Sequence, residues 1–186
     1  MVLQDRRVRR TQLLLTEALI ALTLRKGYEA VTIRDITEQA DIGYATFFRH
    51  YRDKDELLQD VLDAMLAELT DLLAGAVPQD DPTAVGTLIF CYVQSHTDLM
   101  RVLLGSRAVL ARLIAATTRL VVDSRSPVAA GQVPLEIGAH HIVSSTVALV
   151  EWWLERGQPY SPEQMGRIYS DLIAVPTAAL AFTARP

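Results

Sequence analysis

The chain has 186 residues, of which half are hydrophobic and 22% charged, so it can bury a core and is not expected to be disordered. Cys91 is its single cysteine, which excludes an intrachain disulfide and a cysteine-based metal cluster and suits a reducing cytoplasm. The net charge of −4 is unevenly spread: residues 1–54 carry ten Lys or Arg against seven Asp or Glu, and the remainder carries eight against fifteen.

The first apolar segment imitates a signal peptide, but its details predict a helix of the folded protein. Arginines at 6, 7, 9 and 10 precede "TQLLLTEALIALTL", which contains Glu17 and ends in Arg25-Lys26 rather than at a small-residue cleavage site. Helical spacing predicts a first helix over about 5–26, ended by Gly27. No apolar run is long enough to span a membrane, so we expect a cytoplasmic protein.

Two short helices and a longer one are predicted next. Thr32, with Asp35 three residues later, has the capping-box spacing that begins a helix, and this helix ends near residue 40. Residues 41–43 form a tight turn, and residues 44–51 again have helical spacing. Asp53 with Glu56 repeats the capping signature and opens a fourth helix, which runs to about residue 74.

The rest of the chain is also helical, which predicts an all-α fold of about nine helices. "GAVPQDDP" at 75–82 is the clearest break, and "SRSPVAAGQVP" at 124–134 is a loop. Ser161 with Gln164 opens the last helix, which Pro176 should kink or end. The other helices are predicted near 82–97, 99–104, 106–123 and 135–156.

The short helices predict a helix-turn-helix unit. Two short helices joined by a tight turn and braced by a third form the arrangement that sets a recognition helix into the major groove of DNA. Periodicity places Ile42, Phe47 and Tyr51 on the inner face of the second helix of the pair. Its exposed positions are then Tyr44, Ala45, Thr46, Arg49 and His50.

The stretch "KGYEAVTIRDITEQADIGYATFFRHYRDKDELL" resembles the tetracycline-repressor (TetR) family of bacterial transcriptional regulators. The match rests on many positions at fixed spacing, from Gly27-Tyr28 before the threonine cap to Lys54 and Glu56-Leu57 at the start of the fourth helix. Between them lie the other matching residues: Ile33, Ile36, Ala40, Thr46, Phe48 and Tyr51.

The resemblance implies three regions and a homodimer on a palindromic operator. Residues 1–52 would be the DNA-binding domain, with the helix-turn-helix at about 33–52, residues 53–74 a connecting helix, and residues 75–186 an effector-binding and dimerisation domain. The dimer would form through the last two long helices. The resemblance implies DNA contacts by Thr32, Tyr44, Thr46, Lys54 and the positions of Phe48 and His50. The other predicted contact residues are Ala45 and Arg49, at exposed positions of the second helix, and Arg34.

Other uses of these residues remain open. Thr32 caps its helix whether or not it also contacts a phosphate, and Arg34, Arg49 and His50 can equally face solvent. The arginines at 6–10 are either a solvated tail or an arm that follows the minor groove. Gly43 stands where the family often has a capping serine, and Phe48 where it often has a tyrosine whose hydroxyl meets a phosphate.

The carboxy-terminal region offers few chemical signals. Candidates for the effector site are Cys91, His96 and His141, and no metal site is expected because no ligand spacing supports one. Trp152 and Trp153 are expected in the core or the dimer interface, and the small residues Ser144, Ser145 and Ala148 allow close helix approach.

The sequence therefore predicts a DNA-binding transcriptional regulator, a repressor released by a small hydrophobic effector. A helical adaptor of the same fold that has lost DNA binding is the alternative. An enzyme is not expected, because no nucleophile–base spacing or Gly-rich phosphate loop occurs. No cofactor is expected beyond the unidentified effector, and no membrane partner.

Overall fold

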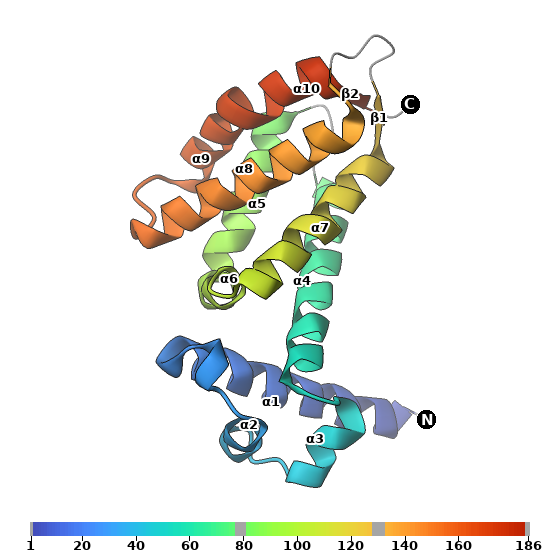
Figure 1. Ribbon diagram of the computed structural model, residues 1–186, viewed down its shortest axis with the longest axis vertical. Helices are drawn as coiled ribbons and strands as arrows, with labels where there is room; N and C mark the ends of the chain where they lie inside the picture. The colour runs from blue at the N-terminus through green and yellow to red at the C-terminus, as the bar shows by residue number, and fades with distance from the viewer. Residues whose placement is uncertain (1, 77–80, 128–132, 185–186) are drawn as a thin grey trace. The chain divides into compact units, whose positions relative to one another are not determined.

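The computed structural model describes residues 2–76, 81–127 and 133–184 (Figure 1). The chain divides into two compact units. The first comprises Met1–Met65 and Asp98–Ser106, and the second comprises Leu66–Thr97 and Arg107–Pro186. Helix α4 (Lys54–Ala76) begins in the first unit and ends in the second. We describe each unit by itself.

The first unit is a set of short helices built on one long one (Figure 1). Helix α1 packs against α2, and α2 packs against α3. Leu15 and Leu19 are fully buried, which confirms the predicted inner face of α1. Besides the start of α4, the elements of this unit are α1 (Val2–Lys26), the 3₁₀ turn η1 (Tyr28–Ala30), α2 (Ile33–Gln39), α3 (Tyr44–His50) and most of α6 (Thr97–Leu104).

The turn between α2 and α3 is fixed by two backbone hydrogen bonds. The Ile42 N–H donates to the Thr37 carbonyl at 2.9 Å, and the Asp41 N–H donates to the Glu38 carbonyl at 3.3 Å. This is the Schellman pattern of a helix end, and it puts Asp41 in the left-handed region at φ 53°. Aspartate tolerates that conformation better than most L residues. The predicted tight turn is confirmed, with a defined geometry.

The second unit is a layer of long helices with one short strand pair. Helix α5 (Pro82–Ser95) packs against α9 (Pro162–Tyr169), and α7 (Arg107–Ser124) packs against α8 (Leu135–Glu155). Helix α9 continues through η2 (Ser170–Ala174) into α10 (Val175–Ala181). Strand β1 (Arg125–Pro127) pairs antiparallel with β2 (Phe182–Ala184), a pairing that the sequence did not predict.

The all-α prediction is confirmed. Over the described ranges the helices form nine rods, if the continuous run from α9 to α10 is taken as one, and their ends lie within a turn of the predicted ones. Parts of the predicted break and loop, residues 77–80 and 128–132, lie outside the described ranges. None of the helices in those ranges is both long and apolar enough to cross a membrane.

The last helix does not end at Pro176, which was one of the two outcomes that the sequence predicted. Proline lacks an N–H and crowds the carbonyl four residues before it. Here the turn before Pro176 widens into the π segment η2, in which the Val175 N–H donates to the carbonyl of Ser170, five residues back. A π turn shifts the hydrogen-bond register by one residue. The helix therefore continues past the proline to Ala181.

Helices α5 and α9 touch at their backbones through a pair of glycines. A Cβ added at Gly166 would lie 2.6 Å from the backbone nitrogen of Thr87 and 2.8 Å from the carbonyl oxygen of Thr83. A Cβ at Gly86 would lie 3.0 Å from the Cα of Gly166. No side chain fits between the two helices at this point. We call Gly86 and Gly166 the glycine seam.

Replacing Gly166 by alanine should destabilise the protein. The added methyl group collides with backbone atoms that cannot rotate away, and overpacking of this kind costs about 1–3 kcal/mol, more than alanine gains in helix propensity. The free energy of unfolding from urea titration measures the effect. Gly43→Ser is the control, because its added Cβ meets only the Thr46 hydroxyl, at 3.6 Å. If the two variants had equal free energies of unfolding, the claim that no Cβ fits between α5 and α9 at Gly166 would be wrong.

Candidate nucleic-acid interface

Helix α3 is held on the first unit by two aromatic residues. Phe47 is fully buried and Tyr51, which follows the helix, is nearly so, as the periodicity predicted. The Tyr51 hydroxyl donates to a carboxylate oxygen of Asp60 on α4 at 2.6 Å. Burial and the neighbouring Asp60 raise the pKa of Tyr51, so the phenol stays neutral and keeps donating. Ile42, the third predicted inner residue, is only half-buried.

Part of the surface of α3 is apolar and exposed. Tyr44 is 56% exposed and Phe48 is 47% exposed. Their ring centroids are 5.1 Å apart and nearly perpendicular, and Phe48 also contacts the ring of the buried Phe47 at 5.4 Å. Ala45 is exposed between them. We call Tyr44, Ala45 and Phe48 the apolar patch of α3.

The polar residues of α3 contact one another or the core. Arg49 donates through Nη2 to the Thr46 hydroxyl at 2.7 Å. His50 is half-buried, with its ring 6.3 Å from that of Tyr51. Arg34 on α2 pairs with Glu38 at 3.4 Å, but both side chains are strongly exposed, so the pair adds little stability. The guanidinium groups of Arg34 and Arg49 lie at the surface.

The predicted capping box of α2 is confirmed. The Thr32 N–H donates to Asp35 at 2.8 Å, and the Asp35 N–H donates to the Thr32 hydroxyl at 3.2 Å. Lys26 of α1 approaches the same carboxylate at 2.7 Å. Lys26 and then Thr32 lower the pKa of Asp35. The ion pair therefore stabilises the fold above the ordinary carboxyl pKa, and this contribution is lost as the pH falls through the lower folded value.

The cap of α4 is confirmed in part. The Glu56 N–H donates to the side chain of Asp53 at 2.8 Å, as expected for an amino-terminal cap. The Glu56 carboxylate does not return to Asp53. It accepts from the backbone N–H of Arg52 at 2.6 Å and from its Nε at 3.1 Å, and both contacts lower the Glu56 pKa.

Lys54 has a role that the sequence did not predict. Its ammonium group donates to the carbonyl oxygens of Tyr28 at 2.9 Å, Val31 at 3.0 Å and Glu29 at 3.4 Å. It also lies 4.5 Å from the centre of the Tyr28 ring, whose hydroxyl donates to Asp55. A lysine has three N–H donors, and all three are used here within the protein. Lys54 thus joins the start of α4 to the turn between α1 and α2.

The amino-terminal arginines are part of α1, which begins at Val2. The side chains at 6–10 are exposed on its first turns.

At the start of α3, Gly43 has φ −59° and supplies no side-chain cap, and the Thr46 N–H donates to the Gly43 carbonyl at 2.7 Å. Its backbone would suit any L residue.

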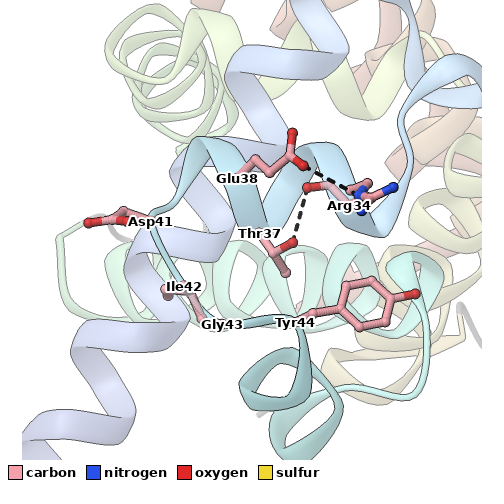
Figure 2. A pocket seen from close by; sticks show the side chains of 7 residues that line it. All are labelled: Arg34, Thr37, Glu38, Asp41, Ile42, Gly43 and Tyr44. Atoms are coloured by element: carbon pink, nitrogen blue, oxygen red, sulfur yellow. Dashed lines mark hydrogen bonds and ion pairs between the residues drawn. The ribbon is translucent and has the colours of Figure 1, made fainter.

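A hollow lies between α2 and the start of α3 (Figure 2). Its volume of about 770 Å³ is in the range of small-molecule sites. Its lining is unlike theirs, because Arg34, Glu38 and Asp41 are charged and exposed and Tyr44 forms one side (Figure 2). It is therefore a feature of the helix-turn-helix surface rather than an effector pocket.

The three effector-site candidates lie at different places in the second unit. Cys91 is exposed on α5, and partial burial together with the nearby Glu163 raises its pKa. His96 follows α5 and stacks on Tyr92 at 4.2 Å. His141 is exposed on α8, 3.4 Å from Ser145. Within the described ranges, no three His, Cys, Asp or Glu residues are grouped closely enough to hold a metal ion.

Two family models match most of the chain. Residues 15–61 match the model of bacterial regulatory proteins of the tetR family, and residues 80–174 match that of a transcriptional regulator C-terminal region. The chain belongs to the TetR family of transcriptional regulators. The first match covers α2, α3 and the start of α4, and the second runs from the loop before α5 into η2.

Relatives and solved structures agree with this TetR assignment. The HTH-type transcriptional regulator YxbF of Bacillus subtilis is 26% identical over 179 residues, which are 92% of this chain and 46% of YxbF. The HTH-type transcriptional repressor Rv3405c of Mycobacterium tuberculosis is 36% identical over 64 residues, 34% of each chain. The chain thus spans less than half the length of these relatives.

A solved TetR-family regulator of Syntrophomonas wolfei has the same fold. It superposes with a TM-score of 0.75 over 91% of this chain and 96% of that one, at 16% identity. At this identity the likeness concerns the fold alone.

Replacing Lys54 by methionine should lower the melting temperature. Methionine keeps an unbranched apolar side chain but leaves three carbonyls without their donor, and hydrogen bonds to a charged group contribute about 1.5–3 kcal/mol. Arg52→Met is the matched control, since it removes the same charge two residues earlier from a side chain that is 85% exposed. Equal melting temperatures, measured by circular dichroism, would show that the contacts of Lys54 are dispensable.

Proposed function

We propose that this TetR-family protein is a transcriptional repressor that binds operator DNA through α3. The observation that carries the proposal is the exposed face of α3, presented by a helix whose other face is locked by Phe47 and Tyr51. A locked helix with exposed large side chains is what base-edge contact in the major groove requires. The relative Rv3405c is itself named a repressor, which favours repression over activation.

We remove Lys54 from the proposed DNA contacts. Because the ammonium protons of Lys54 are used inside the protein, we infer that it positions α3 rather than binding a phosphate. The proposed regions remain 1–52 for DNA binding, 53–74 as the connecting helix and 75–186 for effector binding and dimerisation. The proposed contact residues are Thr32, Arg34, Tyr44, Ala45, Thr46, Phe48, Arg49 and His50.

A homodimer through α8 and the α9–α10 rod is proposed from an exposed apolar surface. Leu172 is 70% exposed, and Val175 and Leu180 are exposed further along the same rod. On α8, which packs against α10, Ile137 and Trp152 are exposed as well. Large apolar side chains on two adjacent helices are typical of an interface that is covered in the functional state. Trp153, by contrast, is fully buried in the core.

A small hydrophobic effector remains part of the proposal. The glycine seam leaves no room for one between α5 and α9 at that point. Among the described residues, the buried hydroxyls of Thr23 on α1 and Thr118 on α7 have no hydrogen-bond partner, and of these two only Thr118 lies in the second unit. A buried hydroxyl without a partner is costly, and a ligand with one polar group would satisfy it. We therefore favour the surroundings of Thr118 over Cys91, His96 and His141 as the effector site.

Binding to operator DNA should be specific and steeply dependent on salt. A dimer contacting six to ten phosphates should lose about 10³-fold or more in affinity between 50 and 200 mM salt. Arg49→Ala should weaken binding about 10-fold to 100-fold without changing the melting temperature. Fluorescence anisotropy with promoter fragments measures both.

The control is Arg107→Ala, which removes an exposed arginine at the start of α7 and should leave affinity unchanged. Salt-insensitive binding, or no binding to any promoter fragment, would favour the adaptor alternative.

The wild-type protein should be a dimer at micromolar concentration, and Leu172→Glu should be a monomer. A buried carboxylate without a partner cannot be accommodated in an apolar interface. Size-exclusion chromatography with light scattering gives the mass directly. Leu13→Glu on α1, which also charges an exposed leucine, should remain dimeric. A monomeric wild type, or a dimeric Leu172→Glu, would refute the proposed interface.

A further inference from the structure

One side of α8 faces solvent in the single chain, and two histidines lie on it. Successive residues of an α-helix are about 100° apart, which puts the residues of this side within about 60° of one line along the helix. The opposite side carries buried residues such as Ala139, Val143 and Val150. Ser144 is half-buried and the others are exposed. We call the following residues the outer face of α8: Ile137, His140, His141, Ser144, Ala148 and Trp152.

His141 lies near the middle of this outer face. It follows Ile137 by one turn and precedes Ser144 and Ala148. These two are the smallest residues of the face, so two helices can approach each other closely there. Ile137, near the start of α8, and Trp152, near its end, belong to the proposed dimer interface. A second copy of the chain that covers both of them also covers His141.

His141 has no charged residue within one turn of it on α8. Its Nδ1 lies 3.4 Å from the Ser145 hydroxyl. One hydroxyl does not replace the water around a charged ring. The positions three and four residues away, 137, 138, 144 and 145, are all uncharged. His140 differs in this respect, because Glu136 lies four residues before it.

The other charged groups near α8 come from α7, η2 and α8 itself. Helix α8 packs against α7, η2 and α10, and its Trp153 contacts Phe90 of α5. Helices α5 and α10 contain no Asp, Glu, Lys, Arg or His. Cys91 and Tyr92 of α5 stay neutral, because burial raises both pKa values. The charged residues are Glu136, Glu151 and Glu155 on α8, Arg107, Arg112, Arg119 and Asp123 on α7, and Asp171 on η2.

Protonation of His141 should therefore oppose dimer formation. Histidine is the side chain that ordinarily gains a proton between about pH 8 and pH 5. In the single chain the exposed ring keeps its water in either form. In the dimer a charged ring would lose that water beside Ile137 and Ala148, and burial of this kind disfavours the charged form. Two-fold symmetry doubles the effect, because each copy contributes its own His141.

We propose that the dimer is pH-sensitive: it forms with His141 neutral and dissociates when His141 of each copy takes up a proton. This inference rests on the proposed dimer and specifies how it is regulated. Since one dimer reads the two half-sites of a palindromic operator, acid also releases the protein from DNA.

Sedimentation velocity of the wild-type chain at pH 7.5 and pH 5.5 tests the proposal. If both His141 rings must be neutral in the dimer, its dissociation constant should rise about 100-fold at the lower pH. Ordinary carboxylates are already ionised over this interval and ordinary lysines and arginines remain charged. Far-UV circular dichroism at both pH values shows whether the chain stays folded.

Variants assign the effect to one side chain. His141→Gln keeps a neutral hydrogen-bonding group, so its dissociation constant should change less than about threefold between the two pH values. His141→Lys carries a charge at both, and at pH 7.5 it should dimerise at least about tenfold more weakly than His141→Gln. His140→Gln is the matched control: it removes the adjacent histidine, beside Glu136, and should keep most of the wild-type pH dependence.

The outcomes separate this inference from the proposed dimer. A wild type that is monomeric at pH 7.5 would exclude both the interface and its regulation. If the wild type dimerises but its dissociation constant changes less than about threefold at pH 5.5, the pH switch is wrong and the dimer stands. The same holds if acid tightens the dimer, as pairing of His141 with a carboxylate such as Asp171 across the interface would do. Equal pH dependence of His141→Gln and wild type would mean that another group is responsible.

Discussion

The contacts of Lys54 are what the geometry of the first unit depends on. The 3₁₀ element η1 is a single turn, and the Lys54 ammonium donates to the carbonyl oxygen of Tyr28 within it and to that of Val31, which follows it. The next residue, Asp55, accepts from the Tyr28 hydroxyl. Lys54 and Asp55, consecutive residues of α4, therefore contact the backbone carbonyl and the side-chain hydroxyl of Tyr28. Only residues 51–53 link α3 to α4 along the chain, and Tyr51 among them is hydrogen-bonded to Asp60 of α4. The position of α4 therefore constrains the position of α3.

The second unit is held together by a different kind of contact. Its glycine seam brings the backbones of α5 and α9 together without intervening side chains. Gly86 also makes room for the ring of Tyr169, a residue whose burial raises its pKa to about 12. Where the two backbones touch, there is no cavity between α5 and α9 and no side chain that could change rotamer to open one. The seam therefore fixes the distance between α5 and α9 at this point.

Sequence periodicity and capping rules predicted the helices well because both depend on residues within one or two turns of each other. The Thr32–Asp35 and Ser161–Gln164 boxes are local in this sense, and both are present. The strand pair β1–β2 and the Lys54 contacts join residues far apart in the chain, and no local pattern encodes them. Of the two outcomes predicted for Pro176, an end of the helix is wrong, because a π segment precedes the proline and the helix continues to Ala181.

The same limits apply to the candidate site. The burial of Phe47 and Tyr51 follows from helical spacing, and it is observed. The orientation of the Phe48 ring, which depends on contacts with both Tyr44 and Phe47, could not be foreseen. Nor could the contacts of Lys54 with the carbonyl oxygens of Tyr28 and Val31, because they depend on where η1 lies in the folded unit.

Residues 41–48 contain three departures from ordinary local preferences, although others occur elsewhere, such as Gln158 at φ 59°. These are an aspartate at positive φ, a glycine where a side-chain cap would be more stable, and two large exposed rings. The neighbouring helices α2 and α4 begin with side-chain caps, which α3 lacks. Such local conflicts are expected where selection acts on a surface rather than on stability.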